Sequence, residues 1–367
     1  MTGDQASANA TLEEWKRSFP LEFEPVNSLA LIHNFLGRFE RGIEEGLEAV
    51  RRNESHGYPY SNLAHAYRGM GRFDDARRTA DRAVALEIET LPTRRLLFQL
   101  ALAAGDDQSA AEHLEWARDR PREFEMIGAR AQALGWFGRV REARQVYEDA
   151  ARLAERRDFP DVGTNHLAWA TAMELVYGNA DRAIELAHRV LARKPGYDSQ
   201  LRAALTLAVA GATSPAEQIA DELAAANPEH TLINSVLVPI VRAGIAIGRA
   251  QPSCAIEHLE VVAPYQLGFI AAFAPIYLRG QAYVMLGRPR EAAAQFQLIL
   301  DHRGTDPFSP FHAIAPLVLA RASAAAGDLD DSVIAYERFL TAWARADPDL
   351  PVLLEARHEY AHLLARA

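Results

Sequence analysis

The strongest constraint on the fold is a glycine that recurs along the chain at intervals of 33 to 40 residues. Each glycine separates two segments whose apolar residues follow the period of a helix. A residue without a Cβ can adopt the positive φ that a tight turn between two helices needs. This self-similarity predicts a solenoid of stacked helix pairs. The marker glycines are Gly37, Gly71, Gly105, Gly138, Gly178, Gly211, Gly248, Gly287 and Gly327.

A second regularity supports the same architecture, because a small residue follows most marker glycines by five positions. A small side chain there lets the second helix of a pair approach the first closely. No segment alternates in the manner of strands joined by hairpin turns. We therefore expect an all-α chain that forms a right-handed α-α superhelix of about nine helix pairs plus a C-terminal capping helix. The small residues are Gly42, Ala76, Ala110, Ala143, Ala183, Ala216, Ala292 and Ser332.

The expected boundaries follow the regularity of the repeats. Residues 1–10 are small and polar, so we expect them to be disordered. Residues 11–20 resemble the second helix of a repeat whose first helix is missing, and we expect a partial repeat helix there. Regular repeats are expected over 21–158, longer and divergent repeats over 159–350, and the capping helix over 351–367.

Composition excludes several function classes. Hydrophobic residues make up 49% and charged residues 24% of the chain, which is typical of a globular protein. The net charge of −10 argues against a surface for nucleic acid or anionic membranes. No secretory signal and no apolar run of about 18 residues is present, so we expect a cytoplasmic protein without membrane insertion. The single cysteine, Cys254, excludes an intrachain disulfide, and we expect it to pack as a small buried residue near a helix start.

The clearest copy of the repeat runs from Tyr58 to Leu86 and carries a family resemblance. Its leucine, alanine, tyrosine, glycine and phenylalanine positions resemble the tetratricopeptide repeat. That resemblance implies a scaffold or adaptor that binds a peptide or protein partner and has no enzymatic activity. The positions are Leu63, Ala64, Tyr67, Gly71, Phe73, Ala76, Ala80 and Ala83.

A narrower resemblance covers most of the chain and is carried by segments of its second half. Five of its segments are similar to the C-terminal repeat region of bacterial receptor-like serine/threonine protein kinases. The chain has no kinase glycine-rich loop, no H-R-D and no D-F-G motif. The resemblance thus implies a sensory or regulatory region of a signalling system and carries over no catalysis. The segments are Ala263–Gly268, Arg279–Tyr283, Leu300–Gly304, Phe339–Trp343 and Ala346–Asp349.

The expected ligand surface is the concave face, which the first helices of stacked pairs line. In such repeats the ligand-facing positions fall three, six and ten residues before the turn glycine. Amides there can satisfy the backbone of an extended peptide, and arginines can hold its carboxylates. The residues expected in this groove are Asn34, Asn62, His65, Arg68, Arg95, Gln99, Gln132, Arg242, Tyr277, Gln281 and Arg321.

Two polar patterns compete with a pure binding function. His358-Glu359-Tyr360-Ala361-His362 matches the H-E-x-x-H motif of zinc hydrolases, in which a glutamate activates metal-bound water. Only five residues follow for a third ligand, so a polar face on the capping helix is the simpler interpretation. A second cluster near a loop could hold a metal or an anion, or could complement the negative end of a helix. It comprises Asp301, His302, Asp306 and His312.

The sequence therefore favours a non-enzymatic solenoid that binds a protein or peptide and needs no cofactor. A regulatory region of a kinase or transcription-regulator system is the alternative, and a zinc hydrolase using His358 and His362 is the remote one. We expect no nucleic-acid partner. Self-association through the N-terminal end is a further expectation, because Leu12 and Trp15 need cover there.

Overall fold

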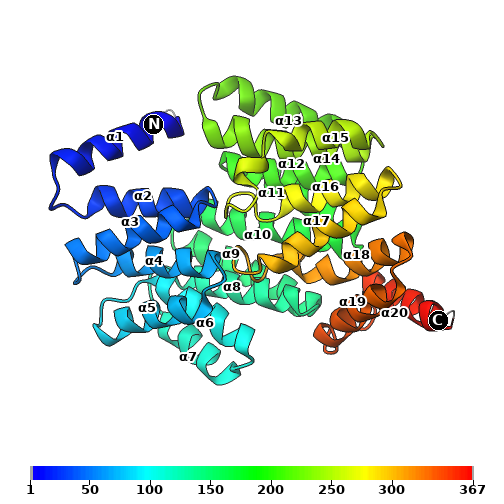
Figure 1. Ribbon diagram of the computed structural model, residues 1–367, viewed down its shortest axis with the longest axis horizontal. Coiled ribbons are helices and arrows are strands. Elements are labelled where there is room, and N and C mark those ends of the chain that lie inside the picture. Colours follow the sequence, from blue (N-terminus) through cyan, green and yellow to red (C-terminus); the bar gives the residue numbers. More distant parts are fainter. Residues whose placement is uncertain (1–2, 366–367) are drawn as a thin grey trace.

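The chain is a stack of helices, which the computed structural model describes over residues 3–365 (Figure 1). This part of the chain holds 20 α-helices and contains no β-strand. The helices of the first half are α1 (Gln5–Ser18), α2 (Glu24–Phe35), α3 (Phe39–Arg52), α4 (Gly57–Gly69), α5 (Phe73–Ala85), α6 (Leu91–Ala104), α7 (Asp107–Ala117), α8 (Glu123–Trp136), α9 (Val140–Arg156), α10 (Pro160–Val176) and α11 (Ala180–Ala192).

The second half continues the stack with slightly more irregular elements. A π-helix, η1 (Ile233–Leu237), runs directly into α14, and a 3-10 turn, η2 (Ala263–Tyr265), follows α15. The α-helices here are α12 (Tyr197–Val209), α13 (Thr213–Ala226), α14 (Val238–Gly248), α15 (Pro252–Glu260), α16 (Ala274–Met285), α17 (Pro289–Asp301), α18 (Pro310–Ala326), α19 (Leu329–Ala342) and α20 (Pro351–Leu364).

Helices α2 to α19 form nine antiparallel pairs, each of which packs on the next, and α20 covers the end of the stack. The predicted all-α superhelix of nine pairs with a C-terminal cap is confirmed. One extra helix, α1, precedes the first pair and packs on α2. None of the helices in residues 3–365 is long and apolar enough to span a membrane.

The turn chemistry is largely as predicted. Eight of the nine marker glycines have positive φ; Gly71, for example, has a φ of 72°. The eight small residues five positions further on are all buried at the contact between the two helices of a pair. A larger side chain at one of them would overpack this contact, which typically costs about 1–3 kcal/mol.

The seventh turn departs from the prediction. Gly248 is the last residue of α14, and the left-handed residue of this turn is Ala250, with a φ of 54°. The small residue five positions after Ala250 is Ala255, which is fully buried. The repeat pattern is therefore intact but shifted by two residues. Gly248 has a different reason to be glycine, because a Cβ there would overlap the backbone oxygen of Ala208.

The N-terminal boundaries were predicted wrongly. Residues 5–10 are helical rather than disordered, and the helix expected over 11–20 begins at Gln5 and ends at Ser18. Asp4 starts this helix, since its carboxylate accepts the Ser7 N–H at 3.3 Å. The chain just before α1 is also held by the second half of the protein, because Thr231 donates its N–H to the Gly3 carbonyl at 3.1 Å. Residues 1–2 and 366–367 of the predicted terminal segments lie outside the described residues.

Two substitutions test the register of the seventh repeat. Gly248→Ala should lower the free energy of unfolding by more than about 2 kcal/mol, because its Cβ meets the backbone of Ala208. Ala250→Gly should cost nothing or stabilise by up to about 1 kcal/mol, because alanine is strained in the left-handed region. Urea unfolding followed by circular dichroism measures both. A reversed ranking would show that Gly248 is the turn residue after all.

Candidate binding surfaces inside the superhelix

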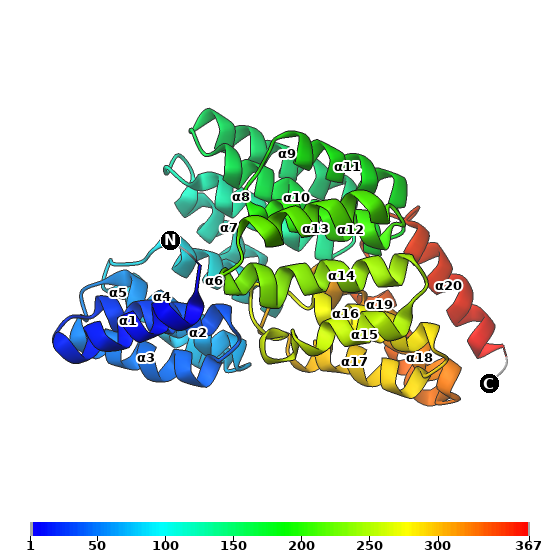
Figure 2. The same cartoon turned by 90° about the horizontal axis from the view of Figure 1, so that it is seen from above.

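The superhelix closes on itself along a contact that we call the seam. Three loops of the C-terminal repeats, residues 261–273, 302–309 and 343–350, pack on the turns of the N-terminal repeats. Figure 1 shows the yellow and orange loops after α15 and α17 against the blue and cyan helices, and Figure 2 shows both halves from above. The interior of the superhelix is therefore filled largely by the chain itself.

The first loop closes the seam through an aromatic side chain. Phe269 packs against the rings of Phe35 and Phe39, whose centroids are 6.4 and 5.5 Å from its own. The guanidinium of Arg68 lies over the same ring at 5.1 Å, which adds a cation–π attraction. Gly268 packs against the turn at Gly37 so tightly that a Cβ on either glycine would overlap backbone atoms of the other segment.

The second loop packs on the next turn and places a backbone acceptor at the seam. Arg68 donates to the Thr305 carbonyl at 3.2 Å and to the Gln99 side chain at 2.6 Å. Gly304 lies against the Arg68 carbonyl, with no room for a Cβ. Further along, Trp136 donates its Nε1–H to Nδ1 of His312 at 3.1 Å, which joins α8 to α18.

The third loop packs on the fourth repeat. The Asp347 N–H donates to the Gly138 carbonyl at 3.0 Å, and its carboxylate accepts the Arg141 N–H at 2.8 Å. Trp343 is almost fully buried and packs edge-on against Tyr177, with ring centroids 4.8 Å apart. These contacts join residues more than 150 positions apart in sequence.

Four of the predicted groove residues are buried and already have partners in the chain, which corrects the expectation that they are open to a ligand. Asn34 donates to the Asn62 carbonyl at 2.8 Å, and Asn62 donates to the Asn27 side chain at 2.8 Å. Arg68 binds Gln99, as described above. These positions do face the interior, but the stacked helices and the seam loops occupy that space.

Four more of the predicted groove residues lie in separate parts of the structure. Nδ1 of His65 contacts the Ser61 carbonyl at 2.8 Å beside Phe269, and burial lowers the pKa of His65 to about 3. Arg95 lies 3.8 Å from Glu125, and Gln132 is half-buried on α8. Arg242 is exposed and pairs with Asp221. The structure does not bring these side chains into one surface.

Two of the last three predicted residues do come together. Tyr277 on α16 and Arg321 on α18 line the same hollow, and Gln281 lies one turn after Tyr277 on α16. Arg321 forms ion pairs with Glu359 at 2.9 Å and with Glu355 at 3.0 Å, both on α20. Burial raises the pKa of Tyr277 to about 12, so its hydroxyl stays protonated and can donate a hydrogen bond.

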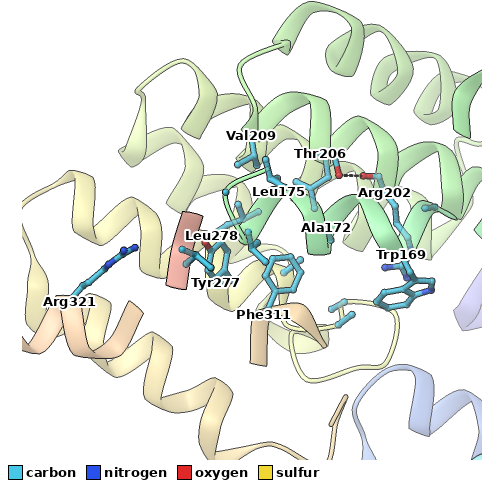
Figure 3. Close-up of a pocket in the computed structure, with 18 of the residues that line it drawn as sticks. Trp169, Ala172, Leu175, Arg202, Thr206, Val209, Tyr277, Leu278, Phe311 and Arg321 are labelled. Atoms are coloured by element: carbon cyan, nitrogen blue, oxygen red, sulfur yellow. Dashed lines mark hydrogen bonds between the residues drawn. The ribbon is translucent and has the colours of Figure 1, made fainter. Parts of the chain in front are cut away.

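Tyr277 and Arg321 line a cavity of about 220 Å³ inside the superhelix (Figure 3). We call it the anchor cavity. Its walls are mostly apolar and come from α10, α12, α16, α18 and α20, together with the end of the first seam loop. The lining residues are Ala168, Trp169, Ala172, Leu175, Val176, Gly178, Arg202, Leu205, Thr206, Val209, Ala271, Ala272, Ala274, Tyr277, Leu278, Phe311, Arg321, Val352 and Glu355.

Arg202 is the polar group that sequence reasoning missed at this cavity. Its guanidinium lies over the Trp169 ring at 3.8 Å, and its Nε donates to Asp198 at 3.2 Å. In the described chain its two terminal nitrogens donate no hydrogen bond. The repeat rule overlooked Arg202 because it lies nine residues before Gly211, outside the three positions that the rule uses.

The zinc-hydrolase interpretation finds no support at α20. Glu359 accepts hydrogen bonds from Arg321 and from the Tyr336 hydroxyl, both at 2.9 Å, so it is held as a structural anion. His358 and His362 are exposed on the helix surface. In residues 3–365, no group of three or more His, Cys, Asp or Glu side chains could hold a metal ion.

The predicted polar cluster near residue 301 is also dispersed. Nδ1 of His302 contacts the Leu298 carbonyl at 2.9 Å, one turn back in its own helix, whereas His312 is buried against Trp136. Burial raises the pKa of Asp306. The expectation for Cys254 was wrong, because its side chain is exposed near the start of α15.

The pH dependence of stability should report on His312. Burial, with Arg303 and Arg338 nearby, lowers the pKa of His312 to about 3, against 6.5 in the unfolded chain. Below pH 6.5 the imidazole therefore binds a proton in the unfolded state but not in the folded state. The free energy of unfolding falls as the pH drops toward 3. His312→Gln should reduce the slope of stability against pH by up to about 1.4 kcal/mol per unit over this window. The exposed control His362→Gln should not change it. Urea titrations between pH 7 and 4 measure the slope, and equal slopes for both variants would contradict a buried neutral imidazole.

A comparison with family models finds one match. Residues 277–351 match the tetratricopeptide repeat, which covers the eighth and ninth helix pairs from Tyr277 onward. No curated protein matches the chain, so that search lends no support to the kinase-region resemblance.

Three solved structures match most of this chain at low sequence identity. The yeast Tom70 structure is 12% identical, with a TM-score of 0.41, and the match covers 99% of this chain and 94% of that chain. The APC/C hetero-tetramer Cut9-Hcn1 is 16% identical, with a TM-score of 0.37, covering 94% of this chain and 71% of that chain. The P58(IPK) TPR domain is 13% identical, with a TM-score of 0.30, covering 94% and 98%.

Proposed function

We propose that this protein is a non-enzymatic scaffold that binds a partner protein by anchoring one bulky apolar side chain in the anchor cavity. The single observation that carries the proposal is the cavity itself, an apolar hollow lined by five helices of the superhelix. The tetratricopeptide match over residues 277–351 covers the helix pairs that supply Tyr277, Phe311 and Arg321. The fold suggests a role in protein interaction, and the anchor cavity is where a side chain of the partner would bind.

The size of the cavity suits a single side chain better than a large cofactor. Pockets for drug-sized ligands measure about 300–1,000 Å³. The anchor cavity, at about 220 Å³, is smaller. A leucine, methionine or phenylalanine side chain fits a hollow of this size, and buried anchors of this kind dominate the affinity of protein interfaces.

The charged groups at the cavity suggest what lies beside the anchor. Arg321 is neutralised by Glu355 and Glu359, so it offers little charge to a partner. Arg202 is held flat on Trp169 and pairs with Asp198 through its Nε alone. Its free terminal nitrogens can receive a carboxylate. The expected partner segment therefore carries an acidic residue close to its apolar anchor.

Other expectations from the sequence remain predictions. They include a regulatory part in a kinase or transcription-regulator system, a cytoplasmic location and the lack of a nucleic-acid partner. Self-association through the N-terminal end is another. Trp15 and Phe19 of that end are 37% and 54% exposed, which leaves apolar surface available there.

Filling the cavity tests the proposal. Peptides are first selected on the native protein from a displayed random library, and we expect them to share one bulky apolar residue next to an acidic one. Ala172→Phe fills the cavity and should weaken the selected peptides at least tenfold, as measured by fluorescence anisotropy.

Ala225→Phe, on the exposed face of α13, is the matched control and should leave the affinity unchanged. Circular dichroism checks that both variants fold. Peptides that bind Ala172→Phe as tightly as the native protein would rule out the anchor cavity as their site. Failure to select any peptide would count against the scaffold function itself.

A further inference from the structure

A second hollow lies at the seam, where the loop 302–309 meets α4, α5 and α6. Its volume is about 250 Å³, and we call it the seam pocket. The lining contains three arginines, Arg68, Arg77 and Arg303, and one carboxylate, that of Asp74. A net positive lining is unusual in a chain whose net charge is −10. The pocket exists only in the closed superhelix, because Arg303 and Pro307 come from the C-terminal half and the other lining residues come from the N-terminal half.

Two of these arginines pair directly with no acid. Neither the Arg77 nor the Arg303 side chain forms an ion pair or a hydrogen bond within residues 3–365, although Asp81 and Asp106 lie within electrostatic range of Arg77. Many other arginines of the chain do pair with an acid. Arg303 is half-buried, and burial together with Arg338 lowers the pKa of its guanidinium. An anion next to Arg303 would relieve this unfavourable burial of charge.

Arg68 supplies further donors at the inner wall. A guanidinium has five N–H groups, and only two hydrogen bonds are formed here, to Gln99 and Thr305. Its Nε is buried without an acceptor. Asp306 is an acid that interacts electrostatically with Arg68, but it forms no ion pair with it, and burial raises the pKa of the Asp306 carboxyl. The stacked position of Arg68 on Phe269 also keeps the guanidinium in place.

We propose that the seam pocket binds the phosphate group of a small phosphorylated molecule. Planar guanidinium groups match the oxygen geometry of phosphate, and several of them together suit a dianion better than a single carboxylate. The pocket volume of about 250 Å³ accommodates a phosphate and a small organic body. Phe73, Leu100 and Pro307 provide the apolar wall against which that body packs.

The ligand contacts both halves of the chain and therefore stabilises the closed superhelix. Arg77 belongs to α5, and Arg303 belongs to the loop after α17, so one bound phosphate bridges the seam. Any ligand that binds only the closed form adds its binding free energy to closure. This inference is independent of the anchor cavity, which lies elsewhere in the superhelix and shares no lining residue with the seam pocket.

Calorimetric titration with phenyl phosphate and with inorganic phosphate tests the site at physiological ionic strength. We expect one phenyl phosphate per chain, weaker binding of inorganic phosphate, and a rise in Tm with either ligand. Arg77→Gln and Arg303→Gln should each lower the affinity for phenyl phosphate at least tenfold, about 1.4 kcal/mol. The matched control is Arg357→Gln on α20, an exposed arginine without an ion pair in the described chain, and it should bind as the native protein does.

Several results would overturn the proposal. One is that neither phenyl phosphate nor inorganic phosphate binds. Another is that Arg77→Gln and Arg303→Gln bind phenyl phosphate as tightly as the native protein does. A third is that benzoate binds with the same affinity as phenyl phosphate. A phosphotyrosine peptide that binds much more tightly than phenyl phosphate would assign the pocket to a modified protein partner instead. If Arg303→Gln does not fold, Arg77→Gln decides the question alone. Because the peptide selection for the anchor cavity uses no phosphate, failure of one proposal leaves the other standing.

Discussion

The packing of three C-terminal loops on the N-terminal turns is the constraint on which the interior of this protein depends. In most solenoids each repeat contacts only its neighbours. Here Arg68 hydrogen-bonds Thr305, which is 237 positions away in sequence, and Asp347 bonds to the Gly138 carbonyl. This closure converts an open concave face into a mostly filled interior. The anchor cavity and the seam pocket are hollows that remain, and each of them is partly lined by residues of the seam loops.

The part of the fold that could be predicted is the part that local chemistry determines. A glycine that permits a left-handed turn and a small residue five positions later specify a helix pair without reference to the rest of the chain. The failure at the seventh turn has a physical reason, because Gly248 is required by its contact with Ala208 while Ala250 takes the strained turn position. The start of α1 was missed for a similar reason: its N-terminus is tied to Thr231, which no local pattern reveals.

The site could be predicted only in part. Position within the repeat selected Asn34 and Arg68, which are buried, but it could not show that other segments of the chain occupy their hydrogen bonds. It did select Tyr277 and Arg321, which line the anchor cavity. Arg202 was missed because residues of five helices line the cavity. A rule based on positions within one repeat cannot identify all of them.

The seam also gives a structural account of three segments that depart from a regular repeat. Residues 263–268, 300–304 and 346–349 lie in or next to the three loops that close the superhelix. Gly268 and Gly304 have no room for a Cβ, and Asp347 makes two hydrogen bonds across the seam. Packing alone thus explains why these stretches differ from a regular repeat.

Hydrogen exchange at the amide of Asp347 tests the closed superhelix most directly. This N–H donates to the Gly138 carbonyl at 3.0 Å, across the seam, and the bond can form only when the third loop packs on the fourth repeat. We predict that the Asp347 amide exchanges slowly, at a rate comparable to amides in the interior of α18, and that Trp343→Ala accelerates it strongly. Exchange at the rate of an unprotected loop in the native protein would contradict closure and, with it, the seam pocket.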